Sequence, residues 1–212
     1  MRSFNRYLDE IYKFDDTRFS SHPILLDLGF CEGQFAIPFL QRYGGSMHGY
    51  EACFETMQRG NLKLVEAGFS VTSRLINCAV TSHGKRTPFY GSDKPLSSSV
   101  YAEDARGLCK KKLINSMTLQ HILTSNILRE VSIDLLKMNI EGAEWTALPT
   151  TPVIAFQHVQ QMVIELHPES AAVTDLDTQF AEITNHLRHG GFQVQVAPKD
   201  APSDCLRLWV HR

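Results

Sequence analysis

The stretch ILLDLGFCEGQFAIPFL, residues 24–40, predicts a buried β-strand, a tight turn and the start of a helix. Its first residues are apolar apart from Asp27, and a continuous apolar run of this kind is typical of a parallel strand that is covered on both faces. The run ends at Gly29, and apolar side chains recur at helical spacing after Gly33. The turn therefore joins a strand to a helix, which is where open α/β sheets bind their ligands.

The same alternation of strand and helix patterns continues along the chain. Further strands are predicted at residues 46–52, 74–82, 131–140 and 159–167, and helices at residues 33–45, 53–68 and 177–191. Two late strand patterns, residues 192–197 and 206–211, are close enough to pair as a hairpin. We therefore expect an α/β fold with a mostly parallel sheet, helices on both faces and an antiparallel C-terminal edge.

Length and composition fit one ordinary domain that spans residues 1–212. The chain has 212 residues, 43% of them hydrophobic, which is enough for one full core. Residues 4–14 carry aromatic and apolar side chains at near-helical spacing. Residues 1–20 are therefore expected to form a helical appendage that packs on the domain and can line one wall of a site.

Residues 83–117 lack the regular alternation. Within them, residues 85–91 resemble an extra strand and residues 96–101 a polar loop, and a helix at residues 117–128 follows with Thr118 as its N-cap. Insertions on such scaffolds usually decorate the ligand face. We expect this irregular segment to select the substrate.

The amino-acid composition limits the kinds of partner that the protein is expected to bind. The formal charge of −2 and pI near 6.5 give no electrostatic reason to expect nucleic acid, and the run Lys110–Lys112 is interpreted as a solvated connection. Five cysteines lack the spacing of a disulfide framework or a zinc site. No stretch approaches the ~20 apolar residues that span a bilayer, and the first residues lack the apolar core of a secretory signal. We expect a soluble cytoplasmic protein without a membrane partner.

The turn after the first strand has the wrong chemistry for a phosphate. Its glycines, Gly29 and Gly33, match neither GxGxxG nor a P-loop, and Asp27 and Glu32 place negative charge where a phosphate would lie. S-adenosylmethionine has no phosphate and carries an ammonium and a sulfonium beside its carboxylate. The glycines would let the backbone approach it and Asp27 would accept from its amino group, directly or through water; the alternative for Asp27 is a turn or capping acid.

Two later strand ends add candidate contacts to the same ligand. Glu51 ends the second strand, where nucleotide-binding α/β proteins place a carboxylate on the ribose hydroxyls. At the end of the third strand, the Asn77 side chain or the backbone around Ala79 is a candidate for adenine, although an Asn at a strand end is more often a turn former.

Several blocks of the chain, in order, resemble the FkbM-type methyltransferases, which are class I S-adenosylmethionine-dependent enzymes. The blocks are DLGFCEGQF, GYEACFETMQRGNLKL, INCAVTSHGKRTPFY, SSSV, MTLQHIL, IDLLKMNIEGAEWTAL and VIELHP, between about residues 24 and 168. The resemblance implies a Rossmann-like class I methyltransferase fold and methylation of a hydroxyl on a sugar, polyketide or other small metabolite. Two positions depart from the family: its Glu-Pro is Glu51-Ala52, and the acid of its Lys-x-Asp-x-Glu-Gly motif is Asn139.

The ends of the fourth and fifth strands lie beside the transferred methyl in this architecture. The candidates there are Lys137, Asn139, Glu141, Glu165 and His167, with Asn139 also near the cofactor. His167 is the preferred general base because its ordinary pKa lies nearest neutrality; the alternative is a turn residue before a proline. Glu141 would orient the substrate or His167, or cap the next helix. Lys137 requires a partner on so apolar a strand, and Asp134 or Glu165 are the candidates.

Four alternatives stay open beside the O-methyltransferase, of which RNA methylation is disfavoured because the surface charge offers little to a phosphate backbone. A divalent ion held by Asn139, Glu141, Glu165 and His167 would activate the hydroxyl, but Asn in place of Asp weakens that set, and no metal is expected. An NAD(P)-dependent oxidoreductase is disfavoured by the missing third glycine and by Asp27. A non-catalytic scaffold that retains the cofactor fold is raised by Asn139.

Overall fold

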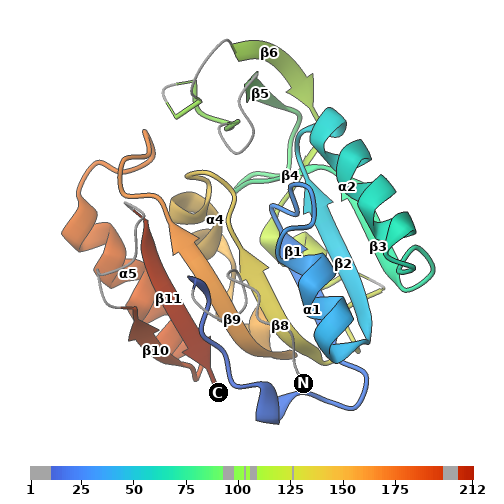
Figure 1. Ribbon diagram of the computed structural model, residues 1–212. Coiled ribbons are helices and arrows are strands. Elements are labelled where there is room, and N and C mark those ends of the chain that lie inside the picture. The colour runs from blue at the N-terminus through green and yellow to red at the C-terminus, as the bar shows by residue number, and fades with distance from the viewer. Residues whose placement is uncertain (1–10, 93–97, 103, 106–108, 126, 198–204) are drawn as a thin grey trace.

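The computed structural model describes residues 11–92, 98–102, 104–105, 109–125, 127–197 and 205–212, and a seven-stranded sheet forms its centre (Figure 1). The strand order is β10-β11-β9-β8-β1-β2-β3. Five strands run parallel, whereas β11 is antiparallel to β9 and β10 is antiparallel to β11. The predicted parallel sheet with an antiparallel C-terminal edge is confirmed. The strands are β1 Ile24–Leu28, β2 Ser46–Glu51, β3 Ser73–Asn77, β8 Ile133–Met138, β9 Val159–Leu166, β10 Gln193–Val196 and β11 Leu206–His211.

Helices cover both faces of the sheet because successive strand residues point to opposite sides. Leu25 and Leu135 pack with α1 and α2 in one buried cluster, whereas Leu26 and Leu136 pack with α3, α4 and α5 in the other. Both faces of β1 and β8 are therefore buried, as their apolar sequences predict. The helices are α1 Ala36–Tyr43, α2 Phe54–Glu66, α3 Leu119–Leu123, α4 Glu144–Thr150 and α5 Leu176–His189, with 3-10 turns η2 Asp16–Arg18 and η3 Val153–Phe156.

The N-terminal segment lies across the sheet near β8 and β9. Of the helix predicted at residues 4–14, residues 4–10 lie outside the described residues, and residues 12–15 have no helical structure. The backbone of Asp15 exchanges two hydrogen bonds with the Gln161 side chain of β9, at 2.8 and 2.9 Å. These bonds fix the segment in an irregular conformation, because they occupy the backbone groups that a helix would use internally.

The irregular segment carries two small sheets. Strand β5, Thr87–Ser92, matches the predicted extra strand and pairs with β6, Cys109–Ile114. The lysines of the run Lys110–Lys112 are exposed, as predicted, but they lie on β6 and not on a connection. Lys112 pairs with Glu55 and Lys111 lies over the Tyr90 ring. Figure 1 places this pair beyond the carboxyl ends of the parallel strands.

Two predicted elements are shorter in the structure. The strand expected at residues 74–82 splits after β3, because the Cys78 amide bonds back to the Glu51 carbonyl and β4, Ala79–Val80, pairs instead with β7, Ser116–Met117. The helix expected at residues 117–128 is limited to α3, because the backbone leaves the helical conformation at Thr124, where φ is −96° and ψ is 5°. Thr118 is confirmed as its N-cap, since its hydroxyl accepts from the His121 amide at 3.0 Å.

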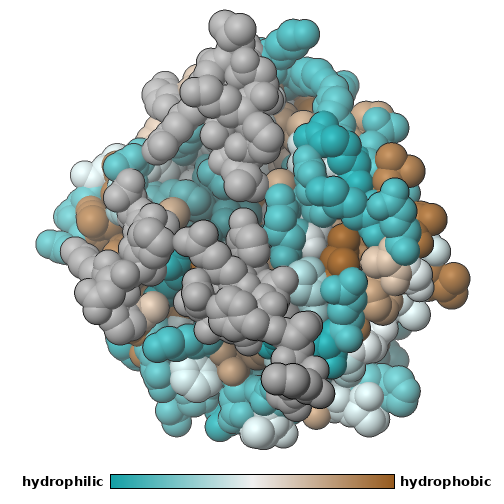
Figure 2. Space-filling model, in the orientation of Figure 1, coloured by the Kyte–Doolittle hydropathy of each residue, from teal (hydrophilic) through white to brown (hydrophobic). Residues whose placement is uncertain are grey.

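Hydrophilic and hydrophobic patches are interspersed on the face that Figure 2 displays. The exposed large apolar side chains on α2 and next to β3 are Phe54, Leu62, Val65 and Val71. Within the described part of the chain, the helices are too short or too polar to cross a membrane.

Two glycines with the same backbone conformation allow a matched stability test. Gly29 and Gly68 both have φ +82°, but a Cβ on Gly29 would lie 1.7 Å from the Asn139 carbonyl oxygen, whereas a Cβ on Gly68 would meet nothing within 4 Å. Gly68→Ala should cost about 1 kcal/mol for the left-handed backbone alone, and Gly29→Ala on the order of 3 kcal/mol because β8 must also move. Urea unfolding of both variants measures the difference, and equal losses would contradict the close approach of β1 and β8.

Candidate active site

A cavity of about 700 Å³ opens at the carboxyl ends of β1, β2, β8 and β9. Its position agrees with the rule that open α/β sheets bind ligands at the ends of their parallel strands. The predicted site residues that line it are Gly29, Glu51, Ala79, Lys137, Asn139, Glu141, Glu165 and His167. Asp27, Gly33 and Asn77 are not among the lining residues. The strand ends therefore bring most of the predicted residues together at the cavity, whereas Asp27, Gly33 and Asn77 lie outside its lining.

The turn after β1 is shaped by its neighbour β2. The amides of Gly29 and Phe30 both donate to the Tyr50 carbonyl, at 2.9 and 3.0 Å. The carboxylate of Glu51 then accepts from the amides of Cys31 at 2.8 Å and Cys53 at 2.7 Å. Burial raises the pKa of Glu51, and these two amides oppose that rise. One carboxylate thus joins the glycine turn to the start of α2 at the cavity wall.

Gly33 and Asn77, which do not line the cavity, support this turn. Gly33 has φ +81°, and a Cβ there would lie 2.8 Å from the Ile37 side chain, so the entry to α1 requires a glycine. The Asn77 amide donates to the carbonyls of Glu51 and Ala52, at 2.8 and 3.0 Å. In this structure Asn77 therefore fixes the backbone that presents Glu51.

A fully buried ion pair lies directly beneath the turn. The Lys137 ammonium is 3.1 Å from Asp27 Oδ1 and donates to the Gly29 carbonyl at 2.6 Å. Burial raises the pKa of Asp27 and the charge of Lys137 lowers it. The partners expected for Lys137, Asp134 or Glu165, are wrong for a topological reason: β1 and β8 are adjacent, and their register places Asp27 opposite Lys137.

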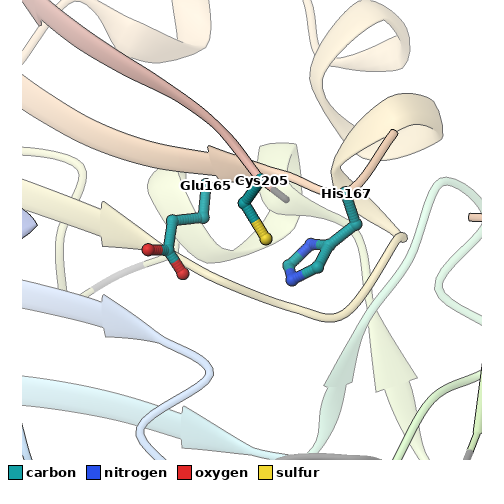
Figure 3. Close-up of side chains that lie close together, drawn as sticks. All are labelled: Glu165, His167 and Cys205. Atoms are coloured by element: carbon teal, nitrogen blue, oxygen red, sulfur yellow. The ribbon is translucent and has the colours of Figure 1, made fainter. Parts of the chain in front are cut away.

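A second ion pair lies at the end of β9. The Arg207 guanidinium of β11 is 2.8 Å from Glu165 Oε1, and the Asn139 amide donates to the other oxygen. Figure 3 shows Glu165 beside His167 and Cys205, and one donor atom from each lies within 4.8 Å of the others. Such a set has the chemistry of a metal site, but the Arg207 cation and the existing partners of Glu165 disfavour a second cation, and we interpret the cluster as an ion-pair network.

His167 lies between two carboxylates. Its Nδ1 is 3.2 Å from Glu144 Oε1, and its Nε2 is 3.7 Å from Glu141 Oε2. Burial alone would lower the pKa of His167, but the negative charge of Glu144, with contributions from Cys205 and Glu141, raises it to about 12. The two carboxylates beside the ring favour the protonated imidazole, which opposes its expected role as a proton acceptor.

Several lining residues were not predicted as site residues, among them Tyr12, Cys205 and Arg207. Tyr12 is 5% exposed and packs edge-on against Phe35 at 5.1 Å; it belongs to the N-terminal segment that was expected to pack on the domain or to line one wall of a site. Arg207 reaches Glu165 because β11 pairs with β9 in a register that places the two opposite each other. The hairpin was visible in the sequence, but its register was not.

The buried pair beneath the turn generates a stability prediction. Lys137→Met should cost about 3–5 kcal/mol at pH 7, because it leaves the Asp27 carboxylate buried without a cation. In that variant the pKa of Asp27 in the folded state lies above its unfolded value, so the ionised carboxylate destabilises the fold at neutral pH. The loss should shrink as the pH falls through that raised pKa.

The matched control is the double variant Asp27→Asn/Lys137→Met, which removes both charges and should recover much of the lost stability. Urea unfolding at pH 5 and pH 7 measures both variants. A single variant with the same loss at both pH values, and no recovery in the double variant, would contradict the pairing.

Comparison with solved structures supports the fold. An rRNA methylase from Streptococcus thermophilus superimposes with a TM-score of 0.55 at 7% identity, over 92% of this chain and 90% of that one. Fibrillarin from Methanococcus jannaschii, a pre-rRNA processing protein, superimposes with a TM-score of 0.56 at 11% identity, over 94% of this chain and 69% of that one. Magnesium protoporphyrin IX methyltransferase from Synechocystis PCC 6803, solved with bound SAM, superimposes with a TM-score of 0.52 at 12% identity. The match covers 90% of this chain and 70% of that one. These likenesses establish a Rossmann-like methyltransferase fold.

No curated protein is similar enough in sequence to count as a relative. The model of the methyltransferase FkbM domain, in contrast, matches residues 27–194, from the acid of the first strand to the C-terminal edge of the sheet. The chain therefore belongs to the FkbM methyltransferase family.

Proposed function

We propose that this chain is an S-adenosylmethionine-dependent O-methyltransferase that acts on a hydroxyl of a small molecule or sugar-like metabolite. The observation that carries the proposal is the charge of the cavity. Its described lining holds five carboxyl residues, Glu51, Asp104, Glu141, Glu165 and Glu169, against three basic ones, Lys137, His167 and Arg207. An excess of negative charge favours a cationic nucleoside and disfavours a pyrophosphate.

The residues around the turn fit this cofactor. Gly29 lacks a side chain and has a backbone that only glycine adopts easily, so the turn can approach a ligand closely. The Glu51 carboxylate is oriented by two amides and retains lone pairs for ribose hydroxyls. The backbone around Cys78 and Ala79 lines the same cavity, where adenine would lie. When bound, S-adenosylmethionine supplies a methyl group on a positively charged sulfur.

The acceptor side lies beyond this pocket. Phe89 and residues 98–100 of the irregular segment line the cavity, as expected of a substrate-selecting insertion. A cavity of about 700 Å³ has the volume of sites that enclose small ligands, which are typically ~300–1,000 Å³. Lys112, from the basic run, already pairs with Glu55. These features favour a small acceptor over a nucleic acid.

Cofactor binding is tested by a matched pair of Glu→Gln variants. Glu51→Gln should weaken S-adenosylmethionine binding about tenfold or more, because a charge-assisted bond to a hydroxyl is worth roughly 1.5–3 kcal/mol. Glu55→Gln, on the exposed start of α2, should leave the affinity unchanged. Calorimetric titration with S-adenosylmethionine measures both, and equal affinities would remove Glu51 from the pocket.

Catalysis is tested with S-adenosylmethionine labelled with tritium in its methyl group. Monosaccharides, methyl glycosides, phenols and aliphatic alcohols form the acceptor panel. We expect label to enter at least one hydroxyl compound and S-adenosylhomocysteine to accumulate. Binding without transfer to any acceptor would favour a non-catalytic scaffold, and nicotinamide absorbance changes without transfer would favour an oxidoreductase.

A further inference from the structure

Both ring nitrogens of His167 face carboxylate oxygens of the protein. Glu144, which faces Nδ1, is fully buried, and its two oxygens accept from the amides of Ile140 at 2.6 Å and Gly142 at 2.8 Å. Trp145 Nε1 donates to the His167 carbonyl at 2.7 Å and fixes the backbone beneath the ring. Carboxylate oxygens at 3.2 Å from Nδ1 and 3.7 Å from Nε2 favour the protonated ring, and an imidazolium has no lone pair for a substrate proton.

Glu141, unlike His167, has the properties of a proton acceptor. Its side chain is 32% exposed, lines the cavity, and has one close cation, His167. Burial raises the pKa of Glu141 to about 7, where His167 and Lys137 lower it and Glu144 and Glu165 raise it further. A carboxyl that is half ionised at neutral pH is matched to accepting a proton in the transition state.

The backbone at Glu141 is a second, independent sign of function. Among the described residues other than glycine, only Cys31 and Glu141 have positive φ, and Glu141 has φ 53°. The Ser99 hydroxyl donates to the Glu141 carbonyl at 2.7 Å and holds this conformation. A Cβ on the next residue, Gly142, would lie 2.2 Å from Ser170 Oγ, so the turn has no room to relax. Strained positions that are held this firmly cluster at active sites.

We propose that Glu141, not His167, accepts the proton of the acceptor hydroxyl, and that His167 is a positioning residue, a fixed cation that holds the Glu141 carboxylate. The inference rests on the proposed function and deepens it. As the hydroxyl oxygen forms its bond to the methyl carbon, the carbon–sulfur bond breaks, its electron pair stays on sulfur, and the hydroxyl proton passes to Glu141 and then to solvent. The Glu144–His167–Glu141 arrangement therefore keeps the accepting carboxylate next to a cation that cannot compete for the proton.

The test is a pH profile of methyl transfer to the acceptor that the labelled panel identifies. The wild-type rate should rise with pH with a midpoint near 7, the pKa of Glu141, and reach a plateau where Glu141 is fully ionised. Glu141→Gln should lower kcat at least about 100-fold on the high-pH plateau, with a smaller loss at low pH where wild-type Glu141 is protonated, and should retain S-adenosylmethionine affinity by calorimetry. His167→Asn should move the rising limb to higher pH, because losing the cation raises the pKa of Glu141, and His167→Lys, which keeps the charge, should restore the limb.

An acceptor-independent readout accompanies the kinetics. In protein with ¹³C-labelled glutamate, the resonance that Glu141→Gln removes should titrate near pH 7 in the wild type and higher in His167→Asn. Equal inactivity of His167→Asn and His167→Lys at every pH, or wild-type turnover in Glu141→Gln, would overturn this inference alone. Absence of transfer by the wild type would overturn the proposed function and the inference together.

Discussion

The buried pair between Asp27 and Lys137 joins the two halves of the cavity. It forms because β1 and β8 are parallel neighbours with these residues in register. The same ammonium holds the Gly29 carbonyl, and Gly29 packs directly on the Asn139 backbone. One cation therefore fixes the glycine turn relative to the end of β8. Methyl transfer depends on alignment of nucleophile, methyl and leaving sulfur, so a rigid link between cofactor and acceptor sides is what the chemistry requires of the fold.

Asn139 acquires a clear role in this network. Its amide donates to Glu165, whose other oxygen accepts from Arg207. A carboxylate at position 139, which the family resemblance leads one to expect, would face the Glu165 carboxylate and repel it unless one of them held a proton. The amide removes that conflict and leaves Glu165 paired. The departure is therefore compatible with a functional site in which another acid, Glu141 in our proposal, handles the proton.

The sequence predicted what depends on local pattern. Apolar runs located β1, β8 and β9, the glycine spacing located the turn, and the positions of Glu51 and Asn139 at strand ends placed both at the cavity. The sequence did not predict features that depend on strand register or on charged groups that only the folded chain brings together. The partner of Lys137 follows from the pairing of β1 with β8, and the protonation of His167 follows from Glu144, which sequence reasoning took only as part of the next helix.

Three of the cavity residues that the sequence analysis did not predict come from outside the family core. Tyr12, Cys205 and Arg207 all lie outside residues 27–194, the part of the chain that matches the family model. The shared core contributes the glycine turn and the carboxylates, whereas segments on either side of it complete the wall by packing onto β9 and α1. The cavity wall is therefore a composite, built from the shared family core and from the two chain segments that flank it.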